Sequence, residues 1–217
     1  MVDFERARAQ MVESQLRGSG VTNAPILARM RTLPRENFVA AGRRDVAYAD
    51  DIQWLGGGSG RVLAAPATLA KLLKLADITG NETVLDIGAG TGYSTAVIAG
   101  LAASVTGLEP DEGLAAEAET NLAGLGLANA SILAGDIDRI GQRRFDVMIV
   151  QGTLDSVPAA YFAALNDGGR LISLIRTGAV SVAHVFVKSA GGVTARAEFH
   201  AFLPPFVARR PNEEFVF

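Results

Sequence analysis

The sequence contains no cysteine, only one tryptophan and only two histidines. The lack of cysteine excludes disulfide bonds, thiolate metal sites and cysteine nucleophiles, and it is compatible with a reducing compartment. No excess of basic charge is present either, because 20 Lys and Arg stand against 23 Asp and Glu, a formal net charge of −3. We therefore expect no polybasic surface for nucleic acid or for an anionic membrane.

Long hydrophobic runs are also absent. No apolar run free of charge or glycine approaches the roughly 20 residues that a membrane-spanning helix needs. The first residues, MVDFERARAQMVESQL, mix charged with apolar side chains, so we expect no signal peptide and a cytoplasmic location. What is present is typical of a folded globule: 49% hydrophobic residues against 20% charged. The oligomeric state stays open.

Residues 1–80 are expected to form a helical extension with a glycine-rich loop. Residues 4–16 have apolar side chains near helical spacing. Asn23 is a suitable N-cap for a second helix, with Pro25 tolerated in its first turn. The segment LPRENFV predicts a further helical turn, DIQWLGGGSGRVLAAP predicts a loop, and PATLAKLLKLADI predicts a helix that begins at Pro66.

Residues 81–217 are expected to form the core, as one compact unit. Strand patterns, separated by helix patterns, occur at TVLDI, SVTGLE, ASILAGD, FDVMIVQG and GGRLISLI. The helices between them are expected at residues 94–102, 111–125 and 157–169, and residues 183–200 predict a closing antiparallel hairpin. Crossovers of this length produce parallel strands. The predicted fold is thus a doubly wound, mostly parallel, seven-stranded Rossmann-like α/β sheet with an N-terminal helical extension.

The stretch LDIGAGTGYS lies where the first of these strands turns into a helix, the usual ligand position in such sheets. Gly88, Gly90 and Gly92 allow a positive φ or a close approach of a ligand to the main chain. The dinucleotide fingerprint G-x-G-x-x-G has its third glycine one residue later, which disfavours a nicotinamide dehydrogenase. Asp86 suits a cationic ligand such as S-adenosylmethionine better than a pyrophosphate.

Two further acids end the next two predicted strands. Glu109 is placed to accept the hydroxyls of a ribose, and Asp136, beside Ile137, is placed to bind an adenine edge. Each residue alone is equally explained as an ordinary turn glycine or a helix-capping acid. Their occurrence at three successive strand ends favours an S-adenosylmethionine site in a class I methyltransferase fold.

The chain resembles the protein-L-isoaspartate O-methyltransferases. The resemblance rests on the segments RAQMVESQL, ILARMRTLPRENFV and AYAD, and then on VLDIGAGTGYSTAVIAGLA, LEP, the Gly135-Asp136 pair, FDVMIV and GGRLI. It extends from about Arg8 to Pro204. The N-terminal segments are its specific part, since other methyltransferases lack them.

The resemblance implies S-adenosyl-L-methionine as cofactor, no metal, and a protein or peptide carboxylate as substrate: an isoaspartyl residue of a damaged protein, methylated for repair. It implies that the loop before Pro66 shapes the substrate site, so the candidate catalytic positions are Ser59, Arg61 and Ala64. The implied cofactor-binding residues are Asp86, Gly88, Ala89, Gly90, Gly92, Tyr93, Glu109, Pro110, Asp136 and Ile137.

The substrate loop departs from the family pattern G-x-G-Q-T-I-S-x-P. The chain reads GSGRVLAAP, with Arg61, Val62 and Ala64 at the Gln, Thr and Ser positions. Arg61 either binds the substrate carboxylate or points to solvent, and Ser59 is a second candidate for the lost hydroxyls. Three hypotheses remain open: an isoaspartyl methyltransferase, a methyltransferase of the same fold with another substrate, and a cofactor-binding protein without catalysis.

Four other residues have structural interpretations. His184 and His200 are interpreted as ordinary strand residues of the closing hairpin. Trp54 either lines a substrate groove or packs in the core, and core packing is preferred. Asp155 either contacts the substrate or caps the helix that begins near Val157, and the cap is preferred.

Overall fold

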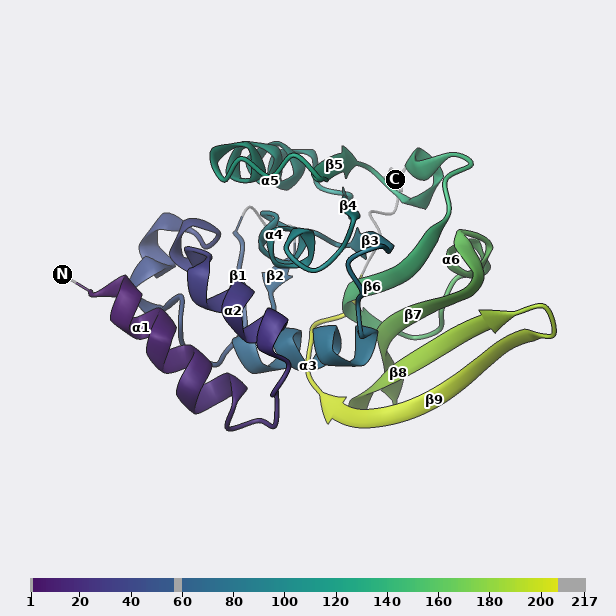
Figure 1. Ribbon diagram of the computed structural model, residues 1–217, viewed down its shortest axis with the longest axis horizontal. Helices are drawn as coiled ribbons and strands as arrows, with labels where there is room; N and C mark the ends of the chain where they lie inside the picture. Colours follow the sequence, from purple (N-terminus) through teal and green to yellow (C-terminus); the bar gives the residue numbers. More distant parts are fainter. Residues whose placement is uncertain (1, 57–59, 207–217) are drawn as a thin grey trace, which may run out of the picture.

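The N-terminal part of the computed structural model, which describes residues 2–56 and 60–206, is helical as predicted (Figure 1). Asn23 caps the second helix through a 3.1 Å bond from the Ile26 N–H to its side-chain oxygen. The helices are α1 (Phe4–Gln10), which continues into the π-helix η1 (Met11–Leu16), α2 (Ala24–Thr32), the 3-10 helices η2 (Arg35–Asn37) and η3 (Ala41–Val46), and α3 (Pro66–Ala76).

A seven-stranded sheet forms the centre of the molecule, and its order is β5-β4-β3-β6-β7-β8-β9. The first five of these strands are mutually parallel, and β8 and β9 add an antiparallel edge, so the predicted fold class is confirmed. The strands are β3 (Thr83–Ile87), β4 (Ser104–Glu109), β5 (Ala130–Ala134), β6 (Phe145–Leu154), β7 (Leu165–Thr177), β8 (Val180–Ser189) and β9 (Gly192–Ala201).

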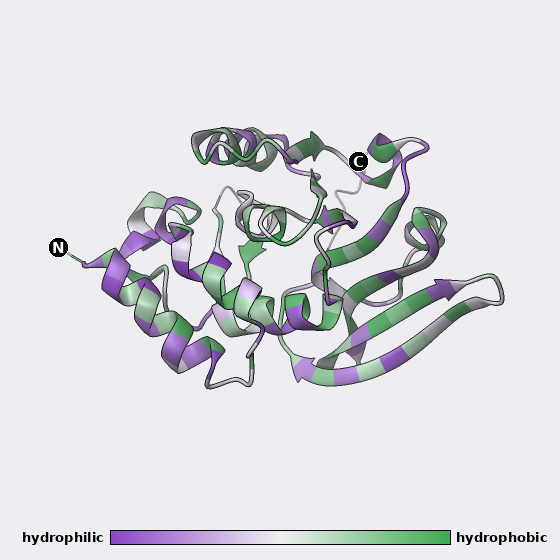
Figure 2. Cartoon of the chain, in the orientation of Figure 1, coloured by the Kyte–Doolittle hydropathy of each residue, from purple (hydrophilic) through white to green (hydrophobic). Residues whose placement is uncertain are grey.

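Helices cover both faces of the sheet because successive side chains of the central strands point to opposite sides. Val84, Val147 and Ile149 belong to one buried cluster, which also holds side chains of α2, α3, α4 (Tyr93–Ala99) and α5 (Glu112–Gly124). The alternate residues of β3 and β6 join a second cluster with η4 (Ile137–Ile140), α6 (Ala159–Ala163) and Phe206. Figure 2 shows the central strands mostly in the hydrophobic colour.

Two local predictions were wrong. The glycine-rich loop contains a small antiparallel hairpin, in which β1 (Gln53–Trp54) pairs with β2 (Val62–Leu63). The helix expected over residues 157–169 ends at Ala163, and β7 begins at Leu165, before the two glycines that were expected to end the helix. Leu165 pairs with Phe145 of β6, so the pairing of the sheet overrides the local helix signal.

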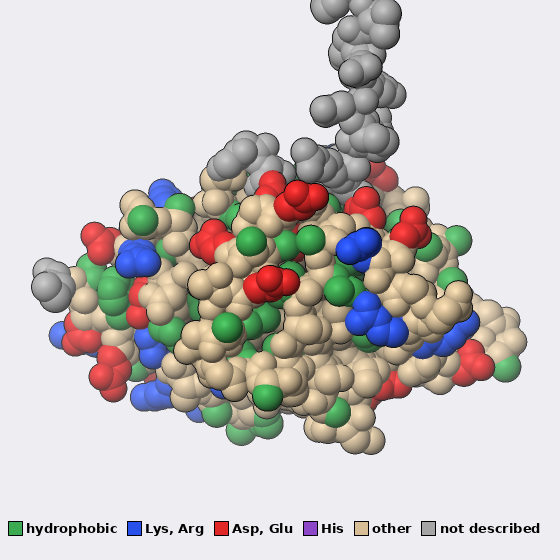
Figure 3. Space-filling view, turned by 90° about the horizontal axis from the view of Figure 1, so that it is seen from above, with side chains coloured by type: hydrophobic (Ala, Val, Ile, Leu, Met, Phe, Trp, Pro, Cys, Tyr) green, Lys and Arg blue, Asp and Glu red, His purple; other side chains and the backbone are tan. Residues whose placement is uncertain are grey.

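Among the helices of residues 2–56 and 60–206, none has both the length and the apolar character of a membrane-spanning segment. The face shown in Figure 3 carries acidic side chains in its middle and basic side chains to either side of them.

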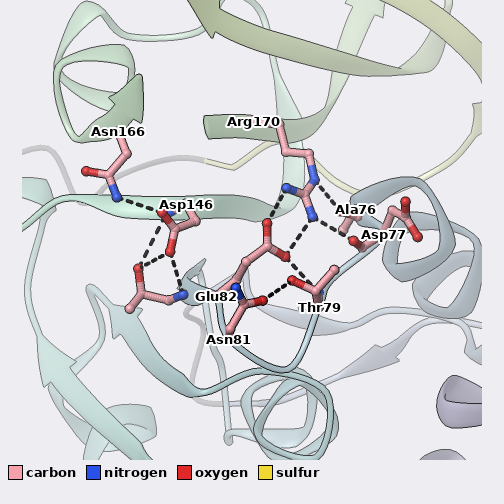
Figure 4. Close-up of polar contacts among 9 residues, drawn as sticks. Ala76, Asp77, Thr79, Asn81, Glu82, Asp146, Asn166 and Arg170 are labelled. Atoms are coloured by element: carbon pink, nitrogen blue, oxygen red, sulfur yellow. Dashed lines mark hydrogen bonds and ion pairs between the residues drawn. The ribbon is translucent and has the colours of Figure 1, made fainter. Parts of the chain in front are cut away.

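A polar cluster at the amino ends of the strands joins residues on both sides of the boundary between 80 and 81 (Figure 4). Arg170 of β7 donates to the main-chain carbonyls of Ala76 and Asp77 at the end of α3. It also pairs with both carboxylate oxygens of Glu82, at 2.7 and 3.0 Å. Beside it, Asp146 of β6 accepts from the N–H and hydroxyl of Thr83, at 2.8 Å each.

Candidate active site

The glycine turn lies at the carboxyl end of β3, between β4 and β6, where the direction of strand addition reverses. This is the ligand-binding position of open α/β sheets. Gly88, Gly90 and Gly92 have φ values of +84°, +56° and +92°, which side-chain-bearing residues rarely adopt. The three glycines therefore present bare main chain at the edge of the sheet, as the sequence predicted.

Asp86 lies directly beneath this turn, and its carboxylate is fully buried. It accepts hydrogen bonds from the hydroxyls of Ser94 and Thr95 in α4, at 2.6 and 2.7 Å, and from the Gln151 amide in β6, at 2.8 Å. Burial raises the pKa of the Asp86 carboxyl, against the lowering effect of these bonds. The carboxylate thus fastens the start of α4 to the sheet.

Glu109 ends β4 and is also fully buried. One carboxylate oxygen accepts the Gly90 N–H at 2.7 Å, and the other accepts the Asp111 N–H at 3.1 Å. Arg61 Nη2 lies 3.3 Å from the oxygen that Gly90 binds. Glu109 and the glycine turn therefore form one hydrogen-bonded unit.

Three side chains stand in front of the turn. A Cβ added to Gly88 would lie 2.1 Å from Arg61 Nη2 and 2.7 Å from Phe206 Cε2. A Cβ added to Gly90 would lie 2.6 Å from Leu55 Cδ1. The Arg61 guanidinium stacks on the Phe206 ring, with Cζ 4.6 Å from the ring centre. Arg61 is only 7% exposed, so the expectation that it could point to solvent is wrong.

The predicted adenine position follows β5. Asp136 is exposed at the start of η4, and Ile137 is partly buried against the second cluster. Near them lies Tyr161 of α6, and burial together with the Asp136 charge raises the pKa of its hydroxyl to about 12, against the opposing charge of Arg61.

The other predicted site residues lie as follows. Ala89 is buried in the turn, and Pro110 is half-buried after β4. Tyr93 begins α4, but its ring is fully buried against Phe38, at a centroid distance of 5.3 Å. Ala64 is buried, and its carbonyl accepts from Arg35 Nη2 at 2.8 Å. Ser59 lies outside the described residues.

Two of the minor predictions were wrong. Trp54 is 53% exposed on β1 and does not pack in the core. Asp155 does not cap α6, whose N-cap is Pro158; its carboxylate instead forms a 2.8 Å ion pair with Arg176. His184 and His200 lie in β8 and β9, as interpreted.

Sequence analysis missed three residues of the site. Gln151 was visible as a polar residue at the end of the apolar run FDVMIV, which indicates a buried hydrogen-bond partner. Phe206 enters through a tertiary contact: its N–H donates to the Thr153 carbonyl at 2.8 Å, beside β6. Leu55 carried no signal, because its role depends on the hairpin that was read as a loop.

The site fits S-adenosylmethionine by three features. The glycines form a cradle that any Cβ would fill, Glu109 supplies a buried carboxylate at the neighbouring strand end, and Asp86 adds negative charge beneath the turn. Arg61 and Leu55, which stand in the cradle, are flexible side chains that can rotate away. In residues 2–56 and 60–206, no three potential metal ligands come together. Fold and site together define the class: a Rossmann-like S-adenosylmethionine-dependent methyltransferase.

Comparison with known proteins gives the family. The model of the protein-L-isoaspartate(D-aspartate) O-methyltransferase family matches residues 6–210. A protein-L-isoaspartate O-methyltransferase of Koribacter versatilis is 35% identical over 193 residues, covering 88% of this chain and 86% of the relative. Protein-L-isoaspartate O-methyltransferase 1 of Rhodopseudomonas palustris is 36% identical over 78% of this chain and 69% of its own. The chain belongs to the protein-L-isoaspartate(D-aspartate) O-methyltransferase family.

Solved structures agree on the fold. A protein-L-isoaspartate O-methyltransferase aligns with a TM-score of 0.80 and 23% identity over 92% of this chain, and the chain spans 66% of that structure's length. A second, from Plasmodium falciparum in complex with S-adenosyl-L-homocysteine, aligns with a TM-score of 0.80 and 19% identity over 93% of this chain and 99% of its own.

Proposed function

We propose that the chain transfers a methyl group from S-adenosylmethionine to the carboxylate of an isoaspartyl residue in a protein or peptide. The observation that carries this proposal is the buried Glu109 carboxylate bonded to the glycine turn, in a chain matched by the family model over residues 6–210. The proposed biological role is repair of damaged proteins in the cytoplasm.

The proposed cofactor site uses the strand ends in order. Gly88, Ala89, Gly90 and Gly92 present main chain to the methionine part. Glu109, followed by Pro110, accepts the ribose hydroxyls, and Asp136 with Ile137 borders the adenine. Asp86 contributes its charge from beneath, and its bonds to Ser94 and Thr95 fix the start of α4, where Tyr93 lies.

The acceptor chemistry needs little help from the protein. When bound, S-adenosylmethionine would supply an electrophilic methyl group on a positively charged sulfur. A carboxylate oxygen would form an ester bond to this methyl as the sulfur–carbon bond breaks, and S-adenosylhomocysteine would leave as a neutral thioether. A carboxylate with a pKa near 4 is ionised in roughly thousandfold excess at neutral pH, so no general base is required. The chain's contribution is to align the acceptor and to exclude water. Ser59, Arg61 and Ala64 are the proposed loop positions that border the acceptor.

The substrate loop lacks two hydroxyl side chains of the family pattern, and this loss bears on the rate of methyl transfer. With Val62 and Ala64, the chain has apolar side chains at two positions of the family pattern that carry hydroxyls. Loss of one hydrogen bond to a charged group costs about 1.5–3 kcal/mol. If that loss is felt in the transition state, the rate falls about ten- to a hundredfold. We therefore expect slow transfer.

Methyl transfer from radiolabelled S-adenosylmethionine to an isoaspartyl peptide tests the proposal. The matched control is the same peptide with an ordinary aspartyl residue, and the protein control is Gly88→Ala. Transfer to the isoaspartyl peptide alone, abolished by Gly88→Ala, supports the proposal. No transfer above the Gly88→Ala background contradicts it, and transfer to other carboxylates only would assign a different substrate to the same fold.

A further inference from the structure

The hairpin β1–β2 places two of its residues directly in the cofactor cradle. Leu55 and Arg61 are adjacent, because the Leu55 N–H donates to the Arg61 carbonyl at 3.0 Å. From this position Leu55 covers Gly90 and Arg61 covers Gly88. Phe206 completes the arrangement from the other side. We call Leu55, Arg61 and Phe206 the cover.

The cover is built into the site through Glu109. Arg61 Nη2 lies 3.3 Å from the Glu109 oxygen that also accepts the Gly90 N–H, and both side chains are almost fully buried. The opposite face of the guanidinium is stacked on the Phe206 ring. Phe206 is in turn fixed to β6, since Thr153 donates to the Pro204 carbonyl and accepts from the Phe206 N–H, at 2.9 and 2.8 Å.

We propose that Arg61 is an internal competitor of the cofactor: it occupies the Glu109 carboxylate and the space before Gly88, so the cofactor binds only when the cover opens. This inference rests on the proposed function, because it assumes that Glu109 accepts the ribose. The exclusion is steric: a ribose hydroxyl cannot enter the space beside Glu109 and Gly88 that the Arg61 guanidinium now fills. Cofactor binding and displacement of Arg61 from the turn are therefore one event.

The competition lowers the apparent affinity for the cofactor. Displacing a buried charged group from its partner consumes part of the binding free energy. The observed affinity is therefore the affinity of the open site multiplied by the fraction of molecules in which the site is open. The family pattern has glutamine where this chain has Arg61. A neutral side chain at this position would not form the ion pair, so the competition is specific to the arginine.

Calorimetric titration with S-adenosylhomocysteine of the wild type and of Arg61→Gln tests the proposal. We expect Arg61→Gln to bind about tenfold more tightly, the size of effect that a charge-assisted contact supplies. Phe206→Ala, which removes the ring beneath the guanidinium, is expected to change affinity in the same direction. The matched control is Arg44→Gln, an exposed arginine of η3, which should leave affinity unchanged.

The chain's single tryptophan gives a second readout that does not depend on turnover. Trp54 lies on β1, next to Leu55, and its pairing partner is Val62, next to Arg61. Addition of S-adenosylhomocysteine is expected to shift Trp54 fluorescence in the wild type, because the surroundings of Trp54 change when the neighbouring Leu55 and Arg61 side chains turn away from the glycines. In Arg61→Gln, the ligand-free spectrum is expected to be already shifted toward the bound one.

The two proposals fail in different ways. If the wild type and Arg61→Gln bind S-adenosylhomocysteine equally, or Arg61→Gln binds more weakly, Arg61 is not a competitor, while the proposed function stands. If no variant binds, the proposed function is overturned and the competition with it. A folded Arg61→Gln, checked by circular dichroism, is required for either conclusion, and Phe206→Ala gives an independent route to the same comparison.

Discussion

At the scale of single residues, the site depends on glycines whose replacement would fill the cradle. Gly88 combines a positive φ with a position where a Cβ would meet Arg61 and Phe206. Gly126 has a similar φ of +64°, but a Cβ there would meet nothing within 4 Å. Comparing substitutions at the two glycines therefore distinguishes the effect of backbone strain from the effect of obstructing the site.

Replacing each of them by alanine tests this difference. We expect both Gly88→Ala and Gly126→Ala to lower the free energy of unfolding by about 1–2 kcal/mol, from strain in the left-handed region. Only Gly88→Ala should also weaken S-adenosylmethionine binding, by about tenfold or more, because its Cβ would fill space in front of the turn that the cofactor needs. Urea unfolding and calorimetry measure the two effects, and equal cofactor affinity in both variants would refute the role of Gly88.

Single residues also show where sequence reasoning stops. Asp86, Glu109 and the glycines could be placed at the strand ends because a strand pattern and a turn are local signals. The cover could not, because Arg61 and Phe206 meet across about 145 residues of chain, and only the folded sheet edge brings them together. Trp54 was misjudged for the same reason, since its exposure depends on which face of a two-residue strand points outward.

At the scale of elements, the polar cluster around Arg170 fixes α3 to the start of the sheet. The Arg170 guanidinium satisfies two carbonyls at the end of α3 and the Glu82 carboxylate, and side-chain exposure of the ion pair is only 19% and 17%. The hydrogen bonds from Arg170 hold the pKa of Glu82 below its usual value.

Arg170→Met is expected to lower the free energy of unfolding by about 2–4 kcal/mol at pH 7, because it leaves carbonyls and a carboxylate unpaired. A depressed carboxyl pKa contributes stability above its unfolded value, and that stability is lost as the pH falls through the folded value. The difference between Arg170→Met and the wild type should therefore shrink as the pH falls below 4.5, the ordinary value for Glu82.

Urea unfolding at pH 7 and pH 3.5 measures this change. The matched control is Arg196→Met, whose ion pair with Glu198 is exposed on β9 and is worth little. A constant penalty for Arg170→Met at both pH values would show that the Glu82 pair does not contribute.

The elements themselves were largely predictable, and the exceptions are instructive. The parallel strands and their antiparallel edge followed from apolar runs and glycine-marked turns. The α6–β7 boundary did not, because Leu165 pairs with Phe145 of β6 and this pairing overrides the local helix propensity. The β1–β2 hairpin was missed because strands of two residues carry no periodicity.

At the scale of the whole molecule, the N-terminal extension and the sheet share one core. The larger buried cluster includes Met11 and Leu16 of the extension together with Val105 and Ile172 of the sheet. Arg35, which is fully buried, adds a polar link: it donates to the carbonyls of Ala47 and Ala64, at 2.7 and 2.8 Å. Its guanidinium also lies 4.9 Å from the centre of the Tyr93 ring in α4.

We therefore expect residues 1–80, predicted as a helical extension, and residues 81–217, predicted as the core, to unfold together. Arg35→Met should lower the free energy of unfolding by about 2–5 kcal/mol, because two buried carbonyls lose their donor. It should keep one cooperative transition in circular dichroism and Trp54 fluorescence alike. Arg31→Met, an exposed control on α2, should change stability by less than about 0.5 kcal/mol. Separate transitions by the two probes would contradict a shared core.

A crystal structure of the protein with S-adenosylhomocysteine would show whether the glycine turn and Glu109 hold the cofactor. We expect ribose hydroxyls within about 2.6–3.2 Å of the Glu109 carboxylate, main-chain contacts at residues 88–92, adenine beside Asp136 and Ile137, and Arg61 turned away from Gly88. A ligand bound elsewhere, or one that leaves the Arg61–Glu109 pair intact, would contradict this expectation.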